Sequence, residues 1–237
     1  MMNKIILSVF IIFSFSVKAQ VKAITEDGKE VVLFDNKTWK FVNESDDKTL
    51  ETITTNEELF EKSKESTFLV KSKNINAGFY YNPKSWKIVK APGATAFVEY
   101  AFNNNSNSAI YALFGSEIVP IQSLKNLKDI LLPAIQRNAD YFRLKNSEYR
   151  TINGIKVLHI EYSANVKGID FEYIANLYLT NEGYASISTY TYANKFEANK
   201  KEMENFVNGI IKTEKGKDIV EIIKSDPPPP MLQKNSK

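Results

Sequence analysis

The sequence predicts an α+β fold: an antiparallel β-sheet meander packed by helices, with a small N-terminal β-hairpin module. Between residues 149 and 192, four β-rich runs alternate with turn signals, of which Asn153-Gly154 is the strongest. Two further stretches, one after Ser123 and one from about residue 194 to 212, carry apolar residues at helical spacing. Successive hairpins flanked by such helices are typical of an α+β domain.

Residues 20–43 are expected to form the small β module. Three β-rich runs are separated by turn residues, and Asp27-Gly28 in the first turn is typical of a hairpin. Three short strands bury too little apolar surface to be stable alone. We therefore expect the module to dock on the main domain, on a partner or on a second copy of the chain.

Residues 1–19 have the three parts of a cleavable secretory signal peptide. Lys4 supplies the positive charge, an apolar run of about 13 residues follows, and small residues precede a cleavage site between Ala19 and Gln20. That run is shorter than the roughly 20 residues that span a bilayer. With 0 Cys in the chain, neither a lipid-anchored cysteine nor a disulfide is possible. We expect a periplasmic or secreted protein with no transmembrane helix in the mature chain.

The charge balance argues against a nucleic-acid partner. The chain has 31 Lys and Arg against 28 Asp and Glu, and cleavage removes Lys4 and Lys18, so the mature net charge is about +1. No basic stripe stands out from the acidic background.

The main domain is predicted over residues 67–213, between an acidic polar linker at 44–66 and a Pro-containing tail at 214–237. One helical turn is expected within the linker at 56–64. In the main domain, Ser123 is the expected N-cap of a helix whose apolar positions continue to Phe142, and Pro133 is expected to kink or split it. The last helix is expected to include Ile210 and Ile211. Four prolines in the tail, 227–230, favour a polyproline II segment.

The segment from Gly78 to Trp86 places aromatic residues before a Pro-x-x-Trp pattern that begins at Pro83. Together with the element order of residues 67–213, this pattern resembles the PsbP-like superfamily, which includes small exported bacterial proteins of unknown function. The resemblance implies an antiparallel sheet covered by helices. It also implies a non-catalytic protein that binds other proteins or assists their assembly, and it carries no specific contact residues onto this chain.

Few catalytic chemistries fit the residues. One histidine, His159, and the absence of cysteine exclude paired-histidine metal sites, thiolate catalysis and cysteine zinc sites. No Gly-x-Ser-x-Gly motif accompanies His159, so we expect it to face solvent or a neighbouring side chain. Glu161, Asp170 and Glu172 could serve a hydrolase, but surface charge on a solvated sheet face is the expected role. We assign no catalytic, metal or cofactor residues.

The last predicted strand places Tyr184, Tyr190 and Tyr192 on one face, with two serines between them. Tyrosine pairs an apolar ring with a polar tip and so suits protein contact, although it is also an ordinary strand residue. The predicted function is a non-enzymatic envelope protein that binds another envelope protein or assists assembly, with these tyrosines as the candidate partner-binding residues. A hydrolase that uses the sheet carboxylates and a small-molecule or lipid carrier remain alternatives, and the oligomeric state is open.

Overall fold

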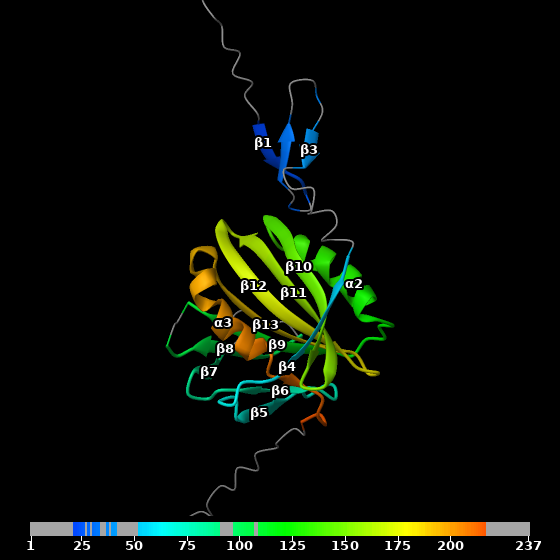
Figure 1. Ribbon diagram of the computed structural model, residues 1–237, viewed down its shortest axis with the longest axis vertical. Helices are drawn as coiled ribbons and strands as arrows, with labels where there is room; N and C mark the ends of the chain where they lie inside the picture. The colour runs from blue at the N-terminus through cyan, green and yellow to red at the C-terminus, as the bar shows by residue number, and fades with distance from the viewer. Residues whose placement is uncertain are drawn as a thin grey trace, which may run out of the picture.

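An eight-stranded sheet lies at the centre of the computed structural model (Figure 1). All neighbouring strands are antiparallel except β4 and β10, which run parallel. In sheet order the strands are β4 (Thr54–Phe60), β10 (Tyr141–Ile152), β11 (Ile155–Val166), β12 (Ile169–Leu179), β13 (Tyr184–Tyr192), β9 (Tyr111–Glu117), β8 (Val98–Asn104) and β7 (Trp86–Val89).

Within the described ranges, a second sheet and two α-helices cover the central sheet. The second sheet has the order β14 (Ile210–Ile211), β6 (Gly78–Tyr81), β5 (Phe68–Lys71). The helices are α2 (Leu124–Gln136) and α3 (Phe196–Val207), the latter preceded by a 3-10 turn at Ala193–Lys195. The structure describes residues 21–26, 28, 30–33, 37, 39–41, 52–90, 97–106 and 109–216. The expected signal peptide and the tail beyond residue 216 lie outside these ranges.

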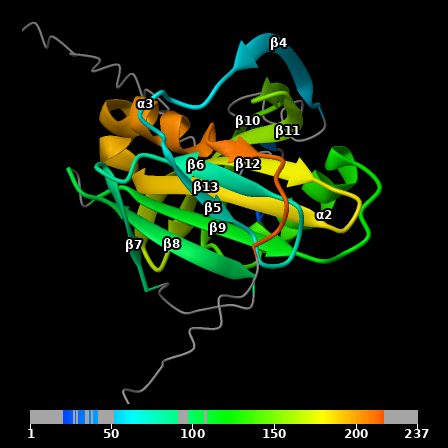
Figure 2. The same ribbon diagram turned by 90° about the horizontal axis from the view of Figure 1, so that it is seen from below.

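The two faces of the central sheet carry separate cores. On one, here called the α3 face, α3 and the second sheet bury a group of aromatic rings that includes Phe79, Phe102 and Phe206. On the other, the α2 face, α2 packs near β10–β12 over a core that includes Leu127, Leu158 and Ile160. In Figure 2, α3 and β6 lie on one side of the sheet, and α2 lies at its other end, away from β7. The predicted α+β meander packed by helices is confirmed.

Tight turns set the register of the four meander strands. Asn153 and Gly154 both have positive φ, 49° and 78°, as the predicted two-residue turn requires. Lys167 and Gly168 form a second such turn, with φ of 54° and 80°. The Asn153 side chain also accepts from the N–H of Lys62 (2.8 Å) and donates to Ile210 O (2.8 Å). This one turn therefore ties the meander to both the N-terminal and the C-terminal segments of the domain.

The structure corrects three predictions of secondary structure. The helical turn expected at 56–64 is wrong, because residues 54–60 form β4, an edge strand. Lys128 of α2 holds the chain just before β4 against β10. The Lys128 ammonium donates to Thr52 O (3.3 Å) and Ser147 Oγ (3.0 Å). Burial lowers the pKa of Lys128, the neighbouring Asp129 opposing that effect.

Both predicted helices also extended too far at their C-terminal ends. Ser123 does cap α2, its Oγ accepting from Asn126 N (3.1 Å), but the helix ends at Gln136, soon after Pro133. Phe142 instead begins the buried face of β10. Ile210 and Ile211 leave the last helix and pair with β6. In both cases the apolar spacing continues past the helix, because the following strand faces the same core.

Three short antiparallel strands form the N-terminal unit: β1 (Val21–Ile24), β2 (Glu30–Leu33) and β3 (Trp39–Phe41). The unit meets the main domain where Gly28, at φ 80°, lies against the backbone of Phe142. A Cβ at Gly28 would fall 1.2 Å from Phe142 O. Only glycine therefore fits this contact, which is made to Phe142, the second residue of β10.

Truncation of Phe206 should destabilise the fold strongly. This side chain is 2% exposed and packs its ring on Phe79, Phe102 and Trp86, so Phe206→Ala leaves a cavity and should cost about 3–5 kcal/mol. Phe68→Ala is the matched control, because Phe68 is 51% exposed, and its cost should stay near 1 kcal/mol. Urea unfolding followed by circular dichroism measures both; equal losses would contradict the assignment of the α3-face core.

Candidate functional site

Four tyrosines stand in one row across the α2 face: Tyr111 on β9, Tyr190 on β13, Tyr173 on β12 and Tyr162 on β11. Each is the direct cross-strand partner of the next. Their ring centroids follow at 5.3, 5.4 and 4.6 Å, with interplanar angles of 18°, 27° and 3°. We call these residues the tyrosine row. Such cross-strand aromatic pairs stabilise a sheet and fix its register.

Stacking determines what the row presents to its surroundings. Because the rings cover one another's faces, their edges and hydroxyl groups point away from the sheet. Exposure falls along the row, from partly exposed Tyr111, Tyr190 and Tyr173 to Tyr162, which is 8% exposed in the core below α2. Phe171 and Tyr192 form a second stacked pair beside the row (5.4 Å, 25°), and Tyr192 is 39% exposed. The part of the α2 face on β9, β13 and the start of β12 is thus aromatic and accessible.

A shallow groove lies beside the row, over β7, β8 and β9. Tyr111 and Tyr190 form one wall, Ala101 and Leu113 line its floor, and β7 forms the far wall with Lys87, Val89 and Lys90. Both lysines are exposed, and within the described ranges neither has an ion-pair partner. Among the described rings, Tyr111 stacks on Tyr190 alone, whereas Tyr190 and Tyr173 each contact rings on both sides. The groove therefore combines an aromatic wall with positive charge.

The three tyrosines singled out from the sequence have different positions. They share one face of β13, as predicted, and the opposite side chains Ala185, Ile187 and Thr189 are buried on the α3 face. Tyr190 and Tyr192 lie in the accessible aromatic region. Tyr184 is only 5% exposed: its ring stacks on Phe97 (5.7 Å) and its hydroxyl donates to Glu117 Oε2 (3.1 Å).

Sequence reasoning missed Tyr111, Tyr173 and Phe171. Phe171 and Tyr173 have the same parity on β12, and that spacing was the available signal. Their alignment with Tyr190 depends on the pairing of β12 with β13, and Tyr111 reaches the row only because β9 pairs with β13 across a long connection in sequence.

The carboxylates considered for hydrolysis lie on the α3 face and are largely neutralised. The expected solvated position is wrong for Glu161 and Glu172, each 8% exposed. Glu172 accepts from Lys145 (2.6 Å) and from Ser163 (3.0 Å). The register shift between Leu144 and Asn146 provides the extra residue, Lys145, that reaches this carboxylate. Asp170 is exposed and accepts from Asn165 (2.7 Å) near the turn.

His159 belongs to a buried polar chain under α3. It is 0% exposed, and its Nδ1 lies 2.8 Å from Asn176 Oδ1. Asn176 donates through Nδ2 to Val207 O (3.0 Å), near the end of α3. The other ring nitrogen lies 3.4 Å from Glu161, which also accepts from Lys200 of α3 (2.9 Å). These groups link two strands to α3 and leave His159 turned toward neighbouring side chains.

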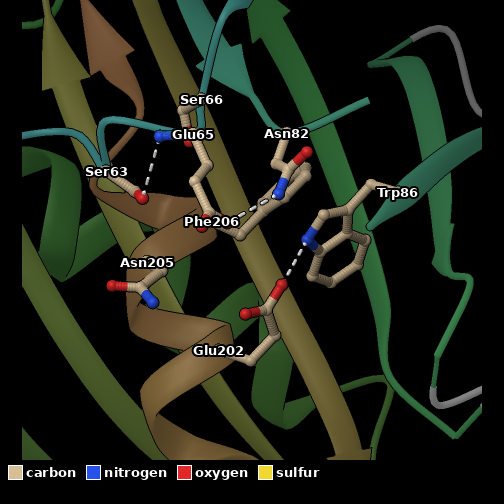
Figure 3. A pocket seen from close by; sticks show the side chains of 8 residues that line it. All are labelled: Ser63, Glu65, Ser66, Asn82, Trp86, Glu202, Asn205 and Phe206. Atoms are coloured by element: carbon tan, nitrogen blue, oxygen red, sulfur yellow. Dashed lines mark hydrogen bonds between the residues drawn. The ribbon is translucent and has the colours of Figure 1, made fainter. Parts of the chain in front are cut away.

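The Pro-x-x-Trp segment noted in the sequence contacts α3 through Trp86 (Figure 3). Trp86 is 2% exposed, stacks near Phe206 (4.3 Å) and donates its indole N–H to Glu202 (2.8 Å). Asn82 donates to Glu65 (3.1 Å) across the small polar pocket that these residues line. The pattern thus marks the junction between β7 and α3.

Candidates for a metal site and for a membrane-spanning helix are both absent from the described residues. No group of three or more His, Cys, Asp or Glu side chains there could hold a metal ion. Within the same ranges, none of the helices combines the length and apolarity needed to span a bilayer.

Comparison with known proteins finds similarity among solved structures alone. No family model matches the chain, and no curated protein matches it. A solved PsbP from the cyanobacterium Synechocystis is similar, with 16% identity, a TM-score of 0.49, and coverage of 63% of this chain and 94% of that chain. LpqN, involved in cell envelope biogenesis of Mycobacterium tuberculosis, has 11% identity and a TM-score of 0.35, over 55% of this chain and 80% of that chain.

A protein of unknown function from Pseudomonas aeruginosa, described as a putative regulator, has 10% identity and a TM-score of 0.38. The match covers 58% of this chain and 92% of that chain. A solved PsbP is thus among the structures to which this chain is similar. The likeness concerns the fold and does not extend to function.

Acid should weaken the contact between Glu161 and α3. Burial acts to raise the pKa of Glu161, but its hydrogen bonding with His159 and Lys200 outweighs burial and holds the pKa at about 2, below the ordinary 4.5. A lowered carboxyl pKa stabilises the fold above pH 4.5, and this stabilisation is lost as pH falls toward 2.

Glu161→Gln should therefore lower the free energy of unfolding at neutral pH by about 1–3 kcal/mol, since Lys200 is partly exposed and the ion pair is screened. It should also flatten the decline of stability between pH 4.5 and 2. Denaturant unfolding at a series of pH values measures both effects, and an equally steep decline in both proteins would contradict the assignment.

The tyrosine row should ionise at a higher pH than ordinary tyrosines. Burial, reinforced by Tyr190, raises the pKa of Tyr173 to about 12, and burial raises the pKa values of Tyr162 and Tyr190 as well. A raised tyrosine pKa stabilises the fold below pH 10, and this stabilisation is lost as pH rises through 12. Tyrosinate absorbance should show a late class of ionisations, and Tyr173→Phe should remove one of them. A single transition near pH 10 with the fold intact would overturn this expectation.

Proposed function

We propose that the protein is an exported, non-enzymatic envelope protein that binds another envelope protein through the accessible part of its α2 face. The residues of this binding surface are Tyr111, Tyr173, Tyr190, Tyr192 and Phe171. The observation that carries the proposal is the uncovered aromatic region: α2 packs over the β10–β12 end of the face, and the described residues place no helix over β9 and β13.

The composition of this surface suits a protein partner. Aromatic residues, tyrosine among them, are enriched in interfaces, and their ring edges and hydroxyl groups combine apolar area with hydrogen bonding. The stacked rings are held on rigid strands, so little side-chain entropy is lost on binding. Lys87 and Lys90 at the rim of the groove add charge that favours an acidic partner.

The alternative functions find less support. A hydrolase needs a free carboxylate pair, whereas Glu161 and Glu172 are each bonded to a lysine beneath α3. A carrier needs an open space between sheet and helix, whereas Phe79, Phe102 and Phe206 pack on one another there with ring centroids 5.3–5.6 Å apart.

Capture from intact envelopes tests the proposal. The tagged wild-type chain, crosslinked before extraction, should recover the same partner reproducibly, and the Tyr190→Ser/Tyr192→Ser variant should recover at least about tenfold less, since interface aromatic residues often cost more than 1 kcal/mol on truncation. Leu59→Ser is the matched control: Leu59 is 75% exposed on β4 at the far edge of the sheet, and recovery should not change. No reproducible partner, or equal loss in both variants, would contradict the proposed surface.

A further inference from the structure

We propose that the groove over β7, β8 and β9 binds the proline-rich segment 226–230 of the chain's own C-terminal tail. The inference rests on the proposed function, because the groove shares Tyr111 and Tyr190 with the binding surface. It adds a regulatory element to that surface. The tail segment occupies the groove beside Tyr111 and Tyr190 until a partner displaces the segment.

The groove has the features of a site for an extended proline-rich strand. Proline-rich segments dock on aromatic-lined grooves because the chain is already extended and loses little entropy on binding. One face of the Tyr111 ring stacks on Tyr190 of β13, and the other face lies on the side of β8. Ala101 on the floor is small, so the groove is lower there than at the tyrosine wall.

The charge of the tail segment complements that of the groove. Asp226 directly precedes the four prolines 227–230. Lys87 and Lys90 line the far wall of the groove, and neither has an ion-pair partner among the described residues. A carboxylate at the start of the segment can therefore approach two cations while the proline rings contact Tyr111.

The tail begins close enough to reach the groove. The described chain ends at Gly216, whose N–H donates to Ser72 O (2.6 Å), and the Ser72 hydroxyl lies 2.9 Å from that of Ser116 on β9. Tyr111 is five residues back along the same strand and on the opposite face, so the tail must pass round the end of β9: about 3 Å onward to Glu117, about 10 Å from one face to the other, and about 20 Å back to Tyr111. Residues 217–226 can extend to about 33 Å, which spans this path within one chain.

Chemical nitration of tyrosines in the full mature chain tests the inference. The comparison is between the wild-type chain and a variant in which all four prolines 227–230 are replaced by serine. Nitration of Tyr111, followed by mass spectrometry, should become about three- to tenfold faster in the variant, whereas Tyr192, outside the groove, should not change. Excess synthetic peptide 224–232 should restore the slow rate.

Two further variants locate the contact. Lys87→Glu/Lys90→Glu in the full chain should accelerate nitration of Tyr111 as the proline replacement does, and Asp226→Lys should do so from the tail side. Equal nitration rates of Tyr111 in the wild type and the proline variant would overturn the inference. Protection that grows with protein concentration would also overturn it, because the tail would then bind a second copy.

These results are separate from the capture experiment. If the tail does not bind but the partner is still lost with Tyr190→Ser/Tyr192→Ser, the proposed function stands and the tail inference fails. If the tail protects Tyr111 but no partner is recovered, the proposed function fails and the groove remains a site for the tail.

Discussion

The register of the strands from β10 to β13 decides which side chains lie on each face of the central sheet. Side chains alternate between the two faces of a sheet, so a slip of one residue in any of these pairings would exchange the faces of that strand. The turn at Asn153-Gly154 sets the first pairing and the turn at Lys167-Gly168 the second. With this register Tyr162, Tyr173 and Tyr190 stand side by side on one face. The same register places His159 opposite Asn176 on the other.

The two faces of the central sheet are covered to different extents. The α3 face is closed: a helix, a second sheet and a chain of bonded polar groups cover it, and Glu161 and Glu172 contribute there to the attachment of α3 and the β-bulge of β10. Among the described residues, the α2 face is closed where α2 packs and where Phe97 covers Tyr184. At Tyr111 and Tyr190, stacking stabilises the tyrosine row without a covering helix, because each ring buries its neighbour's face. A surface that keeps its shape without a partner is well suited to bind one.

Local signals in the sequence were enough for much of the fold. The turn at Asn153-Gly154, the Ser123 cap and the alternation of Tyr184, Tyr190 and Tyr192 each depend on a few neighbouring residues, and the structure has all three.

Features that depend on long-range pairing were missed or misplaced. The charged segment that forms β4 is an edge strand held by Lys128 and by its parallel partner β10. Ile210 continues a helical spacing and yet pairs with β6. Tyr111 joins the row through a pairing with β13. Tyr184 lies on the predicted face but is covered by Phe97, a contact that strand parity cannot reveal.

Among the described residues, the tyrosine row is continuous from β9 across β13 to β12, and no helix covers Tyr111 or Tyr190. Nuclear magnetic resonance of residues 20–237 with a soluble paramagnetic agent should show contacts between the rings of Tyr111, Tyr190 and Tyr173 in that order. Solvent relaxation should be strong at Tyr190 and Tyr192, and weak at Tyr162 and at Ile187 on the opposite face. Equal protection of Tyr190 and Ile187, or no ring contact between Tyr111 and Tyr190, would contradict this arrangement.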